Sequence, residues 1–216
     1  VTAFSHVLPL QPSHLKILDV GCGTGAIGFI FAEMGHTVTG LDLSEQMMEI
    51  GRQKATDRGI DLRFVSGDAE HPPFPDNEFD IVVSRHLLWT LPHSDGSLLS
   101  WKRILKTGGK VLVIGGVWND GTKKSHVLKV ISSTLGNIIH PSGTERLTYS
   151  SELQSHLPHI GGISQIEARS YLRKAGFKDI SVVNLIHIRE DQRKRLPWYQ
   201  KINPLGTYYL ISGTKS

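Results

Sequence analysis

The chain has 216 residues, of which 39% are hydrophobic and 20% charged, and its formal net charge is +4. This composition is typical of a globular domain, and the charge excess is too small to predict a nucleic-acid partner by itself. No apolar run reaches the roughly 18 residues that a membrane-spanning helix needs, so we expect no membrane partner. The single cysteine, Cys22, excludes an internal disulfide and favours a reducing, cytoplasmic setting. The sequence starts at Val1 and not at methionine, which leaves room for a further N-terminal segment.

Apolar, β-branched segments alternate with amphipathic segments over the first half of the chain. This alternation predicts a parallel sheet with helices on both faces. Strands are predicted at residues 16–20, 37–41, 62–65, 80–84 and 110–115. The predicted helices are 24–35, closed by Gly35, then 44–59, from the N-cap Ser44 to Gly59, and 95–109, ended by Gly108 and Gly109.

The pattern loosens after Gly116. Residues 117–162 carry one predicted helix, 125–135, and are too long for a simple connection, so we expect a lid or binding loop. A helix from Ser164 to Gly176 follows, and then two strands, 179–188 and 207–214. The basic stretch Arg189–Lys201 between them is predicted to be a solvated hairpin loop. We predict a single domain of residues 1–216 with 117–162 inserted as the lid.

The stretch ILDVGCGTGAIG, residues 17–28, contains two overlapping glycine motifs. One is G-x-G-x-x-G from Gly23, which is typical of dinucleotide-binding loops but weak evidence alone. The other is D-x-G-x-G-x-G from Asp19. A carboxylate at Asp19 would repel a pyrophosphate and suits a ligand that carries an amino group. Asp42, after the second strand, fits the ribose of either ligand, whereas Asp68, after the third strand, is placed to reach an adenine amino group.

Four segments in this order, ILDVGCGTG, GLDLS, GDAEHPPFPDNEFDIVVSRHLLWTLP and LKTGGKVLV, resemble the class I methyltransferases that use S-adenosylmethionine. The resemblance covers roughly residues 16–115 and is greatest to the small-molecule, methyltransferase type 11-like branch. It implies a Rossmann-like, doubly wound α/β fold with a mostly parallel seven-stranded sheet and an antiparallel last strand. It also implies transfer of a methyl group to N, O or C of a small molecule by in-line displacement, with S-adenosylhomocysteine as the product.

The resemblance assigns cofactor contacts to residues at the ends of four strands. Several of them also have a structural interpretation: Asp19 and Asp68 as turn acids, Leu43 and Met47 as core residues, and Arg85 as the partner of a surface acid. Cys22 has a structural interpretation as well, as a small residue tolerated in a tight turn. The implied contacts are Asp19, Gly21, Cys22, Gly23 and, more loosely, Gly25 for the methionine part, Asp42 for the ribose, Leu43, Met47, Asp68 and Ala69 for the adenine, and Ser84 and Arg85 for the amino-acid end.

No catalytic residue is assigned, because a base is needed only when the acceptor holds a proton. His86 is the first candidate base and also reads as a structural histidine, and His93 is a weaker candidate. Trp89 stands where relatives often carry histidine and is expected in the acceptor pocket or the core. No metal site is expected, since Pro158 separates His156 from His159 and no acid or thiol completes a set. Further candidates for the acceptor pocket are Trp118, His126, His140 and Tyr149.

Other functions stay open. The HPPF segment, His71–Phe74, resembles the Pro-Pro-aromatic signature of methyltransferases that act on DNA, but it precedes the fourth strand and does not end it, so we expect no DNA substrate. One alternative is a non-catalytic cofactor-binding or regulatory module of the same fold, because such a module would carry the same motifs. An RNA methyltransferase would depend on Arg189–Lys201, and an NAD-type oxidoreductase on the G-x-G-x-x-G motif and Asp42.

Overall fold

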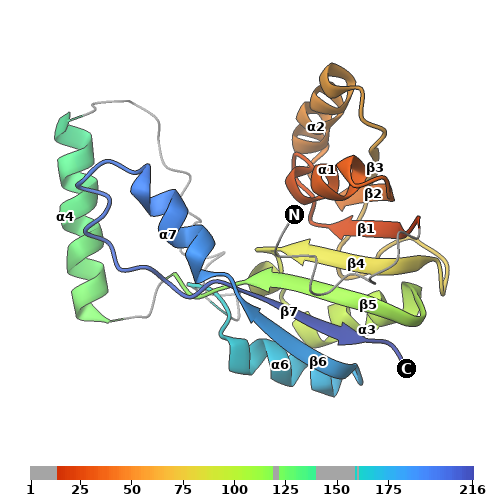
Figure 1. The fold of residues 1–216 in the computed structure, drawn as a ribbon. Helices are drawn as coiled ribbons and strands as arrows, with labels where there is room; N and C mark the ends of the chain where they lie inside the picture. The colour runs from red at the N-terminus through yellow and green to blue at the C-terminus, as the bar shows by residue number, and fades with distance from the viewer. Residues whose placement is uncertain (1–13, 119–121, 140–158, 160) are drawn as a thin grey trace.

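The computed structural model describes residues 14–118, 122–139, 159 and 161–216, and its centre is one seven-stranded sheet (Figure 1). The strand order is β3-β2-β1-β4-β5-β7-β6. Neighbours among the first five strands pair in parallel, and β7 pairs antiparallel with both β5 and β6, which confirms the predicted fold class. The strands are β1 (Lys16–Val20), β2 (Thr37–Asp42), β3 (Arg63–Ser66), β4 (Phe79–Arg85), β5 (Leu105–Gly115), β6 (Lys178–Asn184) and β7 (Tyr209–Thr214).

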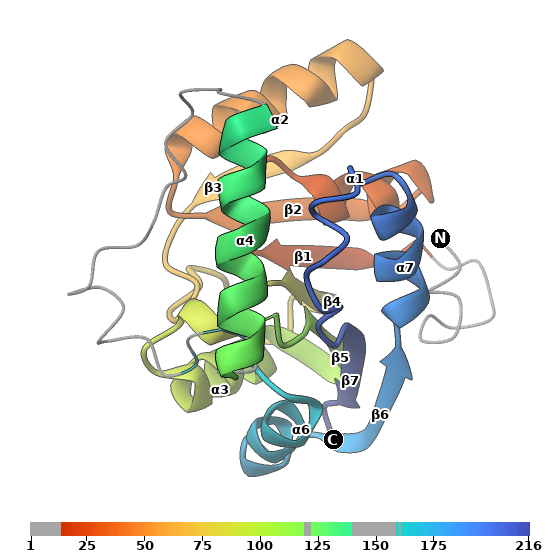
Figure 2. The same ribbon diagram turned by 90° about the vertical axis from the view of Figure 1, so that its left-hand side faces the viewer.

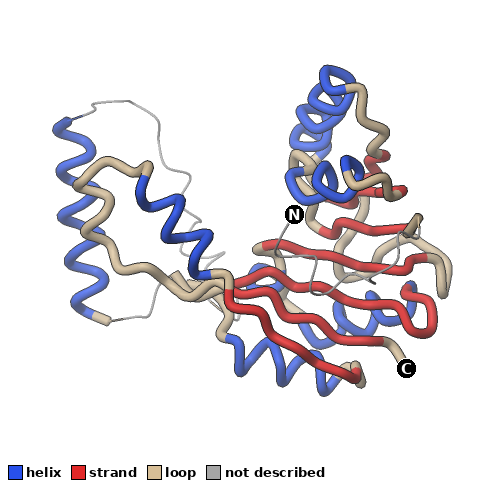
Figure 3. The backbone as a smooth tube through the Cα atoms, viewed as in Figure 1, coloured by secondary structure: helices blue, strands red, loops and turns tan. Residues whose placement is uncertain are grey.

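Helices pack on both faces of the sheet, because successive strand residues point to opposite sides. Ile17 and Leu18 of β1, for example, belong to two separate buried clusters. Figure 3 shows the strands in red between two groups of helices in blue. The first group is α1 (Ala26–Glu33) and α2 (Glu45–Arg58), and the second is α3 (Ser94–Ile104) and α6 (Gln165–Lys174). A short 3-10 turn, η1 (Leu88–Thr90), follows β4.

Local signals in the sequence set most helix ends. The Ser44 hydroxyl accepts the amide N–H of Met47 at the start of α2, and Gly59 ends that helix with a φ of 63°. Ser164 forms a capping box with Glu167 at the start of α6. These predicted caps are confirmed, because each needs only residues within one helical turn.

The predicted end of the third helix is wrong. Helix α3 ends at Ile104, and Gly108 and Gly109 lie within β5. Gly108 has a φ of 77°, and a Cβ on Gly109 would lie 2.8 Å from the carbonyl oxygen of Lys106. The glycines therefore permit a crowded strand start, next to a register shift in the pairing with β4, and do not stop a helix.

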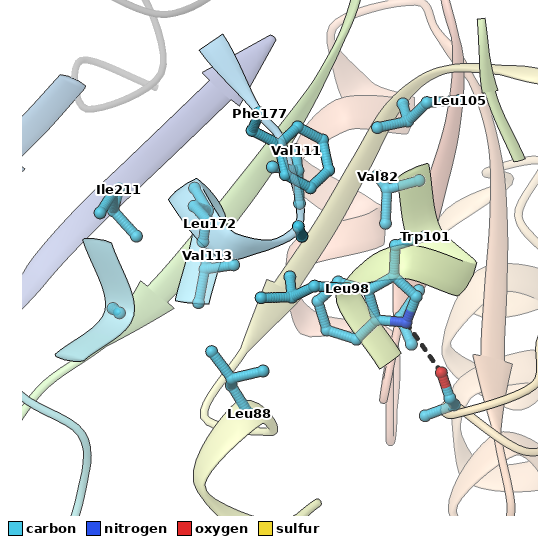
Figure 4. Close-up of a cluster of buried hydrophobic side chains, with 14 of the residues drawn as sticks. Val82, Leu88, Leu98, Trp101, Leu105, Val111, Val113, Leu172, Phe177 and Ile211 are labelled. Atoms are coloured by element: carbon cyan, nitrogen blue, oxygen red, sulfur yellow. Dashed lines mark hydrogen bonds between the residues drawn. The ribbon is translucent and has the colours of Figure 1, made fainter. Parts of the chain in front are cut away.

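The larger buried cluster ties α3 to the loop after β3 (Figure 4). The fully buried Trp101 packs among side chains such as Leu98 and Val82. Its indole Nε1–H donates to the carbonyl oxygen of Ala69 at 2.8 Å. This hydrogen bond fixes the backbone next to Asp68 and so connects the core to the edge of the sheet.

Two further helices, α4 (Lys123–Ile139) and α7 (Ile186–Lys194), lie beyond the carboxyl ends of β1, β4 and β5 (Figures 1 and 2). We call α4, α7 and the segment 195–206 the cap. The predicted hairpin loop over Arg189–Lys201 is wrong, because α7 occupies its first part. The Asn184 Oδ1 accepts the amide N–H of Ile186, and this Asx turn ends β6 and starts the helix. None of the helices in the described part of the chain is long and apolar enough to cross a membrane.

The cap joins the sheet through three backbone segments in close contact, which we call the neck. A Cβ on Gly116 would collide with the carbonyl of Thr207, one on Gly206 with the carbonyl of Val117, and one on Gly162 with the carbonyl of Gly116. The Val117 amide N–H donates to Thr207 Oγ1 at 2.9 Å. Only glycine allows the three segments to approach this closely.

Candidate functional site

The predicted site residues lie at the carboxyl edge of the parallel strands. Val20 pairs with both Leu41 and Ser84, and Asp42 pairs with Ser66, so the ends of these strands are level. From β1 the chain passes to β2 on one side, and it returns to the other side for β4. Ligands of open α/β sheets bind at such a switch point, outside the carboxyl ends of the strands.

The loop after β1 depends on its glycines. Gly21, Gly23 and Gly25 have φ values of 68°, 54° and 79°, which side chains other than glycine rarely adopt. A Cβ on Gly21 would lie 2.8 Å from both Cδ atoms of Leu87. The amide N–H groups of Gly21 and Cys22 both donate to the carbonyl of Leu41. The loop therefore turns tightly across the end of β2 and leads into α1.

Asp19 is a buried carboxyl, 2% exposed, directly beneath this loop. Its Oδ2 accepts the amide N–H of Gly28 in α1 at 2.9 Å. Burial raises the pKa of Asp19 to about 7, against the opposing effects of the Gly28 N–H and of the positive charge on Arg85. The predicted structural role at the turn is present. A cation placed beside this carboxyl would favour its ionised form.

Asp42 links the glycine loop to the start of α2. Its Oδ2 accepts the amide N–H of Gly23 at 2.8 Å, and its Oδ1 accepts that of Ser44 at 2.9 Å. Each carboxylate oxygen accepts a second hydrogen bond readily, so the group keeps capacity for two hydroxyls.

Leu43 and Met47 are apolar side chains on the surface beside Asp42. They are 73% and 42% exposed. The interpretation of Leu43 as a core residue is therefore wrong. Met47 lies over the loop, with its Cε 3.5 Å from the position of a Cβ on Gly23. Two exposed apolar side chains beside the Asp42 carboxylate form a surface that suits a flat, apolar ring.

Asp68 follows β3, with its side chain about half exposed. Its Oδ1 accepts the amide N–H of Glu70 at 2.8 Å, and its Oδ2 lies 3.1 Å from Nδ1 of His71. The Glu70 N–H and then His71 hold the pKa of Asp68 below its usual range. The neighbouring Ala69 is buried and held by Trp101. The carboxylate is thus charged and fixed at the edge.

Ser84 ends the buried part of β4, and Arg85 follows it. The Ser84 side chain is fully buried, and its Oγ has no hydrogen-bond partner among the described residues. An unpaired buried hydroxyl costs about 1–3 kcal/mol, so a ligand that satisfies it would recover that free energy. Arg85 is exposed and forms no ion pair with a described acid, so the predicted pairing with a surface acid is not observed there.

An aromatic layer follows β4, formed by His86, Trp89, Trp118 and Tyr208. His86 has a φ of 57° and stacks on Tyr208, with ring centroids 5.6 Å apart. Trp118 makes T-shaped contacts with both His86, at 5.8 Å between ring centroids, and Trp89, at 4.9 Å. Burial, then the charges of Arg85 and Arg189, lower the pKa of His86 to about 4. Its imidazole is therefore neutral at pH 7, with Nδ1 buried and unpaired among the described residues.

The remaining candidates lie outside the aromatic layer. His93 lies at the start of α3, where its backbone N–H and its ring contact Glu70. The ring of His159 contacts the hydroxyl of Tyr171 at 2.8 Å. The Cys22 thiol packs towards Gly40, and burial raises its pKa. His126 is exposed on α4. His140, Tyr149 and His156 lie outside the described residues.

Sequence reasoning missed the contribution of the C-terminal part to this layer. Tyr208 stacks on His86, and the Arg189 guanidinium lies 4.7 Å from the centre of the Tyr208 ring. Tyr208 belongs to no motif, and Arg189 was noted only as the start of the basic stretch; both come from the C-terminal part, Arg189 from α7 and Tyr208 from the residue before β7. No group of three histidine, cysteine or acidic side chains that would hold a metal occurs within the described ranges, and the absence of a metal stays a prediction.

Comparisons with known proteins agree with this arrangement. A family model described as a methyltransferase domain matches residues 18–113. The chain is 40% identical over 108 residues to the ubiquinone/menaquinone biosynthesis C-methyltransferase UbiE of Cupriavidus pinatubonensis, covering 49% of this chain and 44% of that protein. It is 29% identical over 179 residues to the protein of the same name from Shewanella pealeana, covering 79% and 69%.

A solved structure shows the same fold across the chain. It is phosphoethanolamine N-methyltransferase 2 of Haemonchus contortus in complex with S-adenosyl-L-methionine, which matches with a TM-score of 0.65 and 20% identity. The match covers 99% of this chain and 51% of that one. The chain thus spans about half the length of several relatives it matches. The order of the motifs, the sheet topology and the matched domain agree: residues 18–113 are similar to a methyltransferase domain, and the relatives matched over a larger share of the chain are named as methyltransferases.

Proposed function

We propose that this protein transfers a methyl group from S-adenosylmethionine to N, O or C of a small molecule by in-line displacement. The support is the set of acids at one sheet edge: Asp19, Asp42 and Asp68 each end or follow a different parallel strand. Spaced carboxylates suit a ligand with an ammonium group, a ribose and an adenine amino group. They do not suit a pyrophosphate, which disfavours the NAD-type alternative.

The described residues also fit such a cofactor sterically. Positive φ values at Gly21 and Gly23 keep side chains away from the loop. Leu43 and Met47 offer an exposed apolar surface, and the Ser84 Oγ offers a buried hydroxyl without a partner among the described residues. We propose Asp19, Gly21, Cys22, Gly23, Asp42, Leu43, Met47, Asp68, Ala69, Ser84 and Arg85 as the cofactor-binding residues.

The chain's own groups bind and orient in this mechanism. S-adenosylmethionine supplies, when bound, a methyl group on a sulfonium sulfur that leaves as a neutral thioether. Asp19 holds the ammonium end, Asp42 the ribose hydroxyls and Asp68 the adenine amino group. The aromatic layer excludes water from the end of β4. Alignment of this kind accounts for roughly 7–11 kcal/mol of barrier reduction in favourable cases.

A specific base stays unassigned. His86 is neutral at pH 7, but its pKa of about 4 makes it a weak acceptor of a proton. We propose that it orients the acceptor through its ring. Of the three alternative acceptor atoms, N, O and C, the relatives that are named C-methyltransferases favour carbon. We further propose that residues 117–162 serve as a lid within a single domain, and that the protein works in the cytoplasm, where a lone thiol stays reduced.

Ser84→Ala tests the cofactor site apart from folding. Its hydroxyl makes no hydrogen bond to a described residue, so alanine should leave the free energy of unfolding unchanged or slightly higher. Calorimetric titration with S-adenosylhomocysteine should show a Kd raised about 5- to 20-fold, or about 1–2 kcal/mol. Unchanged affinity would remove Ser84 from the site.

Ser94→Ala is the matched control. Ser94 is buried too, but its hydroxyl donates to the carbonyls of Leu88 and Leu91, so the variant should lose stability and keep its affinity. NADH titrated in parallel should not bind. Methylated product with any small acceptor would exclude the regulatory-module alternative, and product only with RNA would favour the RNA alternative.

A further inference from the structure

A cavity of about 460 Å³ lies in the cap, between α4, α7 and the segment that follows α7. One face of α7 lines it, since Arg189, Gln192 and Arg193 are spaced three and four residues apart. Lys129 and Ser132, three residues apart on α4, line the opposite wall. The cavity is therefore built from two helices that the sequence keeps far apart.

The wall carries charge of one sign. Arg189, Arg193 and Lys129 line the cavity, and no acidic side chain from the described part of the chain does. The acids of α7, Glu190 and Asp191, lie off the lining face, and Asp191 pairs with a lysine on its own helix at 2.7 Å. Within the described ranges, none of the three cations forms an ion pair. Three half-buried cations without a counter-ion attract an anion strongly.

Each cation is held in position but keeps donors free for a ligand. The Lys129 Nζ donates to the carbonyl of Trp118 at 2.9 Å. The Arg193 guanidinium donates to the backbone carbonyl of Lys201. Arg189 lies over the ring of Tyr208 at 4.7 Å. An ammonium has three N–H donors and a guanidinium five, so each group has N–H bonds left, and their positions are set in advance.

A buried acceptor completes the site. The Asn203 side chain donates its Nδ2–H to the hydroxyl of Ser132 at 3.0 Å, but its Oδ1 is buried without a partner among the described residues. A buried amide oxygen of this kind calls for a hydrogen-bond donor. The cavity therefore combines positive charge with one acceptor, which suits an anion that also carries a hydroxyl or amino group.

The cavity adjoins the aromatic layer. Trp118 lines the cavity and also makes a T-shaped contact with His86, which directly follows β4. We propose that the cavity binds a carboxylate or phosphate group of the methyl acceptor, with a neighbouring hydroxyl or amine donating to Asn203, and that the acceptor's reactive atom lies on the β4 side of Trp118. This inference rests on the proposed function.

The test is calorimetric titration of the intact protein with two anions, inorganic pyrophosphate and tricarballylate. The variant Arg193→Gln removes a lining cation. Arg195→Gln makes the same change two residues away on an exposed position that does not line the cavity. We expect Arg193→Gln to raise the Kd of the bound anion about tenfold, which is about 1.4 kcal/mol, and Arg195→Gln less than twofold. Denaturant unfolding checks that both variants are folded.

The two probes separate the two sources of charge: preference for pyrophosphate assigns a phosphate, and preference for tricarballylate assigns a carboxylate. If both variants weaken anion binding equally, the anion is attracted diffusely to a basic surface, and the proposal is overturned. Absence of binding by both anions would overturn it too. S-adenosylhomocysteine is titrated in the same samples. If it binds and the anions do not, this inference fails alone, and if the anions bind and it does not, the proposed function fails while the anion site stands.

Discussion

The substitution Asp19→Asn should remove a pH dependence from the stability of the protein. Asp19 is 2% exposed, and burial raises its pKa from 3.8 to about 7. The folded state then binds this proton more tightly than the unfolded state does. The protonated Asp19 therefore contributes its full share to the free energy of unfolding below pH 3.8, and this contribution is lost as the pH rises through 7. The full loss is about 4 kcal/mol, of which about 2.5 kcal/mol falls between pH 5 and pH 8.

The asparagine variant keeps the geometry without the titration. Its side-chain oxygen still accepts the amide N–H of Gly28, and any unpaired amide N–H adds a cost that does not vary with pH. Urea unfolding of both proteins at pH 5, 6, 7 and 8 gives the comparison. The difference in free energy of unfolding, variant minus wild type, should rise by about 2.5 kcal/mol over this range.

The same substitution should weaken cofactor binding. The pH dependence of wild-type affinity should have the opposite sign to that of wild-type stability, because binding needs the ionised form of Asp19. If Asp19 faces an ammonium group, wild-type affinity for S-adenosylhomocysteine falls about tenfold from pH 8 to pH 6, and the variant loses this slope along with affinity. Parallel stability profiles for the two proteins between pH 5 and pH 8 would refute the reasoning, because they would show that the Asp19 pKa is not raised by burial.

Three other substitutions separate binding from folding. Leu43→Ala should raise the Kd of S-adenosylhomocysteine about 5- to 10-fold and change the free energy of unfolding by no more than about 0.5 kcal/mol. Ile166→Ala, also at an exposed apolar site, should change neither quantity. An unaltered Kd for Leu43→Ala would exclude Leu43 from the adenine surface. Gly21→Ala should lower the free energy of unfolding in urea by about 2–4 kcal/mol, because the new methyl group meets Leu87. Gly35→Ala, at positive φ in open space, should lower it by about 1 kcal/mol. Equal losses would mean that the clash with Leu87 is unimportant. Trp101→Phe should cost about 2–4 kcal/mol through the lost indole hydrogen bond and the space left, and a cost below 1 kcal/mol would contradict that role.

The sequence predicted the parallel strands well, because their signal is local. Strand β1 has the predicted bounds, Lys16–Val20, since its apolar residues Ile17, Leu18 and Val20 directly precede a glycine loop. The predicted start of β5 was wrong, because a glycine pair can mark the end of a helix or an irregularity within a strand. Helix α7 was missed, because its start depends on the Asx turn of Asn184 and on packing of Ile188 against the core.

The acids of the candidate site could be predicted for the same reason: each lies in the last residues of a recognisable strand or just after it. His86, Trp89 and Trp118 of the aromatic layer were candidates for the base or the acceptor pocket as well, but their contact with Tyr208 and the cavity in the cap could not be predicted. Trp118, Arg189 and Tyr208 come from three distant parts of the chain, and only the pairing of β7 with β5 brings them together. No spacing within one segment records such a contact.

The neck has a consequence for the order in which the protein assembles. The contact between Ser132 and Asn203 joins residues 71 positions apart, and the neck needs the backbone at Thr207 next to Val117. Contacts of such long range form late, because closing the intervening loop costs entropy. During synthesis β1 to β5 can pair as they emerge, but the cap stays open until β7 inserts between β5 and β6. A nascent chain stalled before β7 should therefore bury much of the core around α1 and α3 and still lack the cap cavity.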